Sequence, residues 1–183
     1  MKTAKKLLLL LLVFSAAGFA RQRDPLTDAE TDQLRNVRLE PYKRLKLLAK
    51  FTEARLDAID QLRNDPKQAD GRGAKIHDLL EDFTSLIDEI NDNLDQYEGE
   101  QLDKDEHKQF RKGLKELVSD EDRFHARLRS LKHDMETDPQ TKAESRSYEF
   151  ALQDAEESLK SSLEAAREYA QEKDEEKPVE KKR

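Results

Sequence analysis

The spacing of large apolar residues between positions 76 and 135 constrains the fold more than any other feature of the sequence. Over 76–97 and again over 107–135, these residues recur at alternating spacings of three and four without a slip. An α-helix has 3.6 residues per turn, so this spacing places the side chains in one stripe along each helix. The first stripe is Ile76, Leu80, Phe83, Ile87, Ile90, Leu94 and Tyr97. The second is His107, Phe110, Leu114, Leu117, Glu121, Phe124, Leu128, Leu131 and Met135, which are apolar except for His107 and Glu121. The sequence therefore predicts two long amphipathic helices.

Two further apolar stripes flank this pair. One covers residues 34–62, and the other, which is richer in alanine, covers residues 148–170. We expect helices at about 28–63, 74–98, 104–136 and 140–171. Four apolar stripes must be buried, and short connections favour antiparallel neighbours. The predicted fold is therefore all-α: an antiparallel four-helix bundle, or coiled-coil-like helical hairpins, in a bundle domain of residues 27–170.

Short motifs predict where the helices begin and break. Thr27 and Glu30 fit a capping box, in which each side chain accepts a hydrogen bond from the other residue's backbone amide. Thr141 and Glu144 have the same spacing. Pro41 lacks an amide hydrogen and clashes with the preceding turn, so we expect a kink or a restart near residue 40.

The ends of the two central helices are marked as well. Gly99 is a candidate C-cap for the second helix and Asp103 a candidate N-cap for the third. Ser119 and Asp122 could form a capping box that splits the third helix. The unbroken stripe through these positions predicts a continuous helix instead.

The first 20 residues have the layout of a secretory signal peptide. Three lysines precede an unbroken apolar run, Leu7–Phe14, and small residues follow up to Ala20. The stretch 7–20 has 14 residues, fewer than the roughly 20 that a membrane-spanning helix needs. We expect cleavage after Ala20, or alternatively after Ala17, and a periplasmic or secreted protein.

Composition narrows the possible partners. Loss of the leader would remove three lysines and no acid, which changes the formal net charge from −7 to −10. An acidic chain is a poor binder of nucleic acid or of an anionic membrane surface. The chain has no cysteine, which excludes disulfides and thiolate metal sites. The polar lead 21–26 and the charged tail 171–183 are expected to be disordered.

No group of residues has the spacing of a catalytic, cofactor-binding or metal site, and we predict none. The four histidines are His77, His107, His125 and His133. They lack the Glu-x-x-His pairs of di-metal bundles, so we interpret them as surface or edge residues. Glu121 interrupts the apolar stripe of the third helix. Either a partner on a neighbouring helix holds a buried carboxylate, or the helix tilts and Val118 replaces Glu121 inside; we favour the tilt.

Residues 26–30, Leu-Thr-Asp-Ala-Glu, resemble the LTxxQ motif of small periplasmic helical stress chaperones. That family also combines a signal peptide with long helices. Glu30 stands where the family has glutamine, and the sequence holds no second copy of the motif. The capping box explains the same residues, so the chain is not assigned to the family.

These observations favour an exported, non-enzymatic protein that binds other proteins, either itself or an envelope protein, through its helical surface. Sustained heptads can pair between chains as readily as within one. Two alternatives are a chaperone-like, stress-related binder of unfolded proteins and a carrier of a metal or small ligand inside the bundle. An enzyme ranks last, because the chain lacks the motifs of common catalytic sites.

Overall fold

The structure, a computed structural model, describes residues 24–98 and 104–175, and most of these residues are in helices. In chain order the helices are α2 (Asp28–Asn36), α3 (Pro41–Asn64), the short 3₁₀ helix η1 (Pro66–Gln68), α4 (Arg72–Glu98), α5 (Lys104–Thr137), α6 (Pro139–Ser145) and α7 (Glu149–Glu175). These two ranges contain no strand. The prediction of an all-α fold is confirmed. No helix within them has the length and apolar content needed to cross a bilayer.

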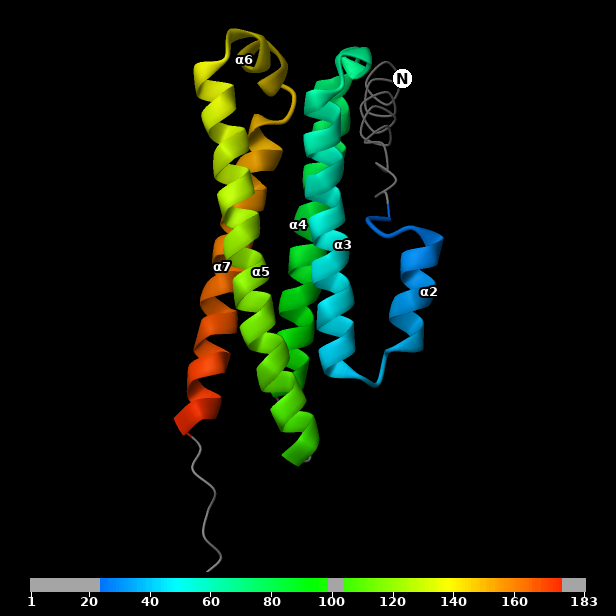
Figure 1. Ribbon diagram of the computed structural model, residues 1–183, viewed down its shortest axis with the longest axis vertical. Coiled ribbons are helices and arrows are strands. Elements are labelled where there is room, and N and C mark those ends of the chain that lie inside the picture. The colour runs from blue at the N-terminus through cyan, green and yellow to red at the C-terminus, as the bar shows by residue number, and fades with distance from the viewer. Residues whose placement is uncertain (1–23, 99–103, 176–183) are drawn as a thin grey trace, which may run out of the picture.

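The long helices α3, α4, α5 and α7 lie side by side (Figure 1). Helix α3 contacts α4 and α5, and α7 contacts the same two helices, so α4 and α5 occupy opposite corners of the bundle. The chain forms two antiparallel hairpins, α3 with α4 and α5 with α7. The hairpins lie together so that α3 runs parallel to its neighbour α5. Thus α3 and α4 are antiparallel neighbours, and so are α5 and α7. Helices α4 and α5 follow each other in the chain but do not pack side by side.

The predicted helix 28–63 is two separate helices. Helix α2 ends at Asn36, and α3 begins with Pro41 at its first position, where a missing amide hydrogen costs nothing. Of the two outcomes expected near residue 40, the chain restarts, and α2 folds back along α3 (Figure 1). The Thr27–Glu30 capping box is confirmed, with the Thr27 amide 2.8 Å from a Glu30 carboxylate oxygen.

The last helical segment also differs from the expected single helix 140–171. It divides into α6 and α7 at residues 146–148. The expected Thr141–Glu144 capping box does not form, because Asp138 accepts the hydrogen bond of the Thr141 amide at 3.0 Å. Glu144 instead pairs with Arg72 at the start of α4, at 2.6 and 2.8 Å. This pair ties α6 to the neighbouring hairpin.

The remaining boundaries follow the prediction more closely. Helix α5 continues through Ser119 without a break, so the prediction of a continuous helix is confirmed. Helix α7 extends to Glu175, so the expectation of disorder from residue 171 is wrong for 171–175. The predicted signal peptide 1–20, residues 21–23, Gly99, Asp103 and the tail 176–183 lie outside the described residues.

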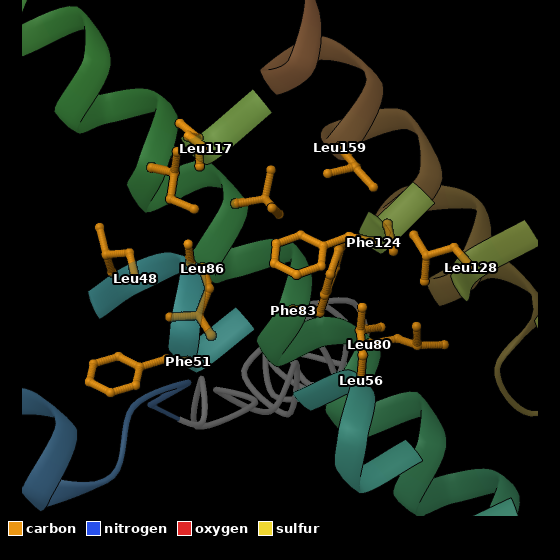
Figure 2. Packing of buried hydrophobic residues seen from close by; sticks show 14 of the residues in the cluster. Leu48, Phe51, Leu56, Leu80, Phe83, Leu86, Leu117, Phe124, Leu128 and Leu159 are labelled. Carbon is orange, nitrogen blue, oxygen red and sulfur yellow. The ribbon is translucent and has the colours of Figure 1, made fainter. Parts of the chain in front are cut away.

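The core is a single apolar cluster along the bundle axis (Figure 2). Two edge-to-face aromatic pairs join α4 to α5. The rings of Phe83 and Phe124 lie 6.1 Å apart at an angle of 80°, and those of Tyr97 and Phe110 lie 5.6 Å apart at 66°. Burial of each leucine or phenylalanine stabilises the fold by about 1.5–3 kcal/mol.

An ion pair holds α2 against α3. The Arg55 guanidinium donates to both Glu30 carboxylate oxygens, at 2.8 and 2.7 Å, and to the Pro25 carbonyl oxygen at 2.6 Å. Its Nε lies 3.7 Å from Asp82 of α4. Bonding to Arg55 lowers the pKa of Glu30. Leu34 of α2 is buried, and Pro25 and Leu26, expected in a disordered lead, are half-buried. One charged contact and a small apolar contact therefore anchor α2.

Truncation of a core residue should show how strongly the bundle depends on its apolar cluster. Leu128 is fully buried, whereas Leu39, in the turn before α3, is 81% exposed. We expect Leu128→Ala to cost about 2–5 kcal/mol, because it leaves a cavity that the neighbouring helices fill only in part. The matched variant Leu39→Ala should change the free energy of unfolding by less than about 0.5 kcal/mol. Urea denaturation measures both values, and equal effects would contradict the described core.

Removal of the Arg55 anchor should release α2 without unfolding the bundle. In Arg55→Met the Glu30 carboxylate loses its cation while the apolar stem is kept. Hydrogen exchange should become faster in α2 and stay unchanged in α4 and α5. Arg123→Met is the control, since the exposed Arg123 side chain pairs only with surface acids, Asp120 at 2.7 Å and Glu53 at 3.5 Å, and such pairs contribute little. Slow exchange of α2 in Arg55→Met would show that the anchor is not needed.

Candidate functional site

The outer side of the bundle has a groove where α3 and α5 lie next to each other. It has a volume of about 480 Å³, and its floor includes Leu45 and Ala49 of α3 and Leu117 of α5. The groove is partly open to solvent. It can therefore receive one side of another molecule without enclosing it.

Tyr42, the second residue of α3, lies at one end of the groove. Its hydroxyl donates to Glu116 at 3.1 Å, and the ammonium groups of Lys46 and Lys112 each lie 5.9 Å from the ring centroid. The ring fits there because α5 has a glycine at position 113. A Cβ at Gly113 would lie 2.7 Å from a ring carbon of Tyr42. The residue type at 113 thus fixes how closely the tyrosine approaches α5.

The rim of the groove carries more positive than negative charge. Its cations are Lys46, Lys112, Lys115 and Arg123, and its acids are Glu116 and Asp120. Glu116 lies 3.7 Å from Lys112 and 3.9 Å from Lys46. The rim is therefore locally cationic, although the whole chain has a formal net charge of −7.

The cationic surface continues past the start of α3. Tyr42 lies beside Gly113, so the residues of α5 before Gly113 project beyond α3. A second hollow of about 410 Å³ is lined by residues of this projecting part, Lys104, His107, Lys108, Arg111 and Lys112, together with Lys115. We call these six residues the basic face. Lys104, Lys108, Arg111 and Lys115 follow each other at spacings of four, three and four, which aligns them along one side of the helix.

The basic face points away from the bundle interior. Phe110, which packs on Tyr97 of α4, is buried, whereas Lys104, Lys108 and Lys115 are exposed. Lys112 and Lys115 line both hollows, so the groove and the basic face form one continuous surface. Sequence reasoning missed this site because it used the charge of the whole chain. The spacing of the four cations was the signal that could have found it.

The four histidines take no part in the core. His133 is exposed, and His77, His107 and His125 are half-buried. His77 Nδ1 lies 3.7 Å from carboxylate oxygens of both Asp78 and Glu81, on one outer turn of α4. All three could reach one cation, but a single exposed turn leaves most of the coordination sphere to water. This cluster is therefore a weaker candidate than the groove and the basic face.

Glu121 corrects the interpretation from sequence. It is fully buried, and Val118, which the sequence favoured in its place, is only half-buried. The Glu121 Oε1 atom accepts a hydrogen bond from the Ser162 hydroxyl of α7 at 2.6 Å, while Oε2 has no partner among the described residues. Burial raises the pKa of Glu121 to about 7, although the bond from Ser162 lowers it in part. The expectation of a tilt is wrong because α7 supplies a donor.

The stability of the protein should fall as the pH rises from 4.5 to about 7. The native state then keeps a proton on Glu121 that the unfolded state has already lost, because the pKa is 4.5 without the fold and about 7 within it. This difference corresponds to about 3 kcal/mol, present in full below pH 4.5 and lost above pH 7. Glu121→Gln should remove this decline and be the more stable protein at pH 8.

Urea midpoints at pH 5 and pH 8 test this prediction. Glu157→Gln serves as the control, because Glu157 is on the exposed side of α7 and its charge costs no desolvation. A Glu121→Gln variant that gains the same stability at both pH values would mean that the buried carboxyl does not titrate in this range.

Comparisons of the chain with protein-family models, with curated proteins and with solved structures find no match. The geometry of the molecule itself therefore identifies its candidate site, an open groove with an apolar floor that continues into a basic face.

Proposed function

We propose that this is an exported, non-enzymatic helical protein that binds another protein through the α3/α5 groove and the basic face. The observation that supports a binding role best is the continuity of the two hollows, which share Lys112 and Lys115. Export to the periplasm or beyond the cell is proposed from the lysines, apolar run and small residues of the first 20 positions.

A helix or extended segment with an apolar side and acidic residues would fit this surface. Its apolar side chains would lie on Leu45, Ala49 and Leu117, and its carboxylates would face the cations of the rim. Helices commonly bind in grooves between two helices in this way. Charge on the rim would speed association and select against basic partners.

A chaperone-like role has less support than binding of a defined partner. A holder of unfolded chains needs apolar surface spread over its exterior. Among the described residues, Leu39 and Phe150 are the large apolar side chains that are most exposed, at 81% and 77%. They belong to the turn before α3 and the start of α7, at opposite ends of the bundle (Figure 1). Two distant side chains do not form such a surface.

Site-specific crosslinking in the native envelope tests the proposal. A photoreactive amino acid at position 108, in the basic face, should form adducts with a defined protein. The same amino acid at position 160 is the control, because Lys160 is exposed on α7. The yield of adducts at position 108 should fall at high salt, since salt screens exposed charges.

Charge reversal adds a second arm to this experiment. Lys104→Glu with Lys115→Glu, in the protein labelled at position 108, should abolish the adducts while leaving the thermal melt unchanged. Equal crosslinking at positions 108 and 160, or none at position 108, would refute a binding role for the basic face.

A further inference from the structure

The outward side of α4 is as acidic as the basic face is cationic. From Ile76 to Glu98 the sequence contains no lysine or arginine and eight acidic residues. Five of them are exposed: Asp78, Glu81, Asp88, Asp92 and Asp95. We call these five the acidic face. Their spacings of three, seven, four and three keep them on one side of the helix.

Two carboxylates of the acidic face contact uncharged groups of the neighbouring helix α7. Asp88 and Asp95 accept hydrogen bonds at 2.8 Å from the hydroxyls of Ser158 and Tyr169 on α7. Hydroxyl donors are uncharged, so neither hydrogen bond pairs the carboxylate with a cation. The cations that α3 contributes here, Arg44 and Arg55, pair with Glu89 and approach Asp82, which are not part of the acidic face.

The two faces cannot meet within one molecule. Helices α4 and α5 occupy opposite corners of the bundle (Figure 1). Phe110 lies on the side of α5 that faces Tyr97 of α4, and the basic face lies on the other side of that helix. One molecule thus exposes two complementary charged surfaces that point in different directions.

We propose that the partner of the basic face is a second copy of this chain, which binds through its acidic face. This inference rests on the binding role proposed above. At 1.5 Å per residue, the cations from Lys104 to Lys115 span about 16 Å and the acids from Asp78 to Asp95 about 26 Å. One acidic face is therefore long enough to pair with the whole basic face. A flat anionic membrane would instead bring its charge close to the acidic parts of the bundle as well.

The contact is heterologous, because it joins two different faces of the same chain. Each pair of molecules leaves one basic face and one acidic face unused, so further copies can add at both ends. Exposed charge pairs supply modest energy and are screened by salt. The assemblies are therefore reversible, and they grow with protein concentration and shrink as salt is added.

A charge-swap experiment tests this inference on the purified exported chain. The first variant combines Lys104→Glu, Lys108→Glu and Lys115→Glu, and the second combines Asp78→Lys, Glu81→Lys and Asp92→Lys. In sedimentation velocity at low salt, the wild-type protein should show a mass that rises with concentration. Each variant alone should stay monomeric, because both of its faces then have the same sign. An equimolar mixture of the two should associate again.

The outcomes separate this inference from the binding role on which it rests. A wild-type protein that is monomeric at every protein and salt concentration would overturn self-association. Either variant associating like the wild type would overturn it as well. Adducts at position 108 with a different protein would then leave the binding role standing. Binding of the wild-type monomer to vesicles containing an anionic phospholipid, lost in the first variant, would assign the basic face to a membrane and overturn the inference.

Discussion

Contact between the aromatic residues of α4 and α5 across the bundle axis is the interaction on which the rest of the arrangement depends. These helices lie at opposite corners, so only long side chains can join them. Phe83 meets Phe124, and Tyr97 meets Phe110. The alanines of α7, such as Ala155 and Ala166, are fully buried and allow that helix to approach closely. Because aromatic contacts fill the diagonal, the outward sides of α4 and α5 face away from each other.

Buried polar groups set how the helices align along this apolar core. Glu121 and Ser162 fix the position of α7 along α5, and Arg55 with Glu30 fixes α2 on α3. Pairs of this kind seldom increase stability over well-packed apolar residues, but loss of one partner leaves the other buried and unsatisfied. Apolar stripes alone allow neighbouring helices to slide by a turn, whereas these polar pairs satisfy each other in one alignment.

The sequence predicted the bounds of the central helices correctly. It did not predict features that depend on contacts between residues far apart in the chain. The bounds of α4 and α5 differ from the predicted ones by at most two residues, because unbroken apolar stripes mark them. The folding back of α2 depends on Arg55, which is 25 positions from Glu30 and gives no local signal. The failure at Glu121 has the same cause, since its donor is on another helix. The basic face was visible in the sequence but was lost when charge was summed over the chain.

Folding does not account for the separation of charge between the outward sides of α4 and α5. Residues four apart on a helix are neighbours, and like charges at that spacing are destabilising. The basic face contains three such pairs, Lys104 with Lys108, Lys108 with Lys112, and Arg111 with Lys115, and α4 adds Asp88 with Asp92. An even mixture of signs would stabilise both helices more. Contact between each face and a surface of opposite sign would offset this repulsion, and one chain presents both surfaces.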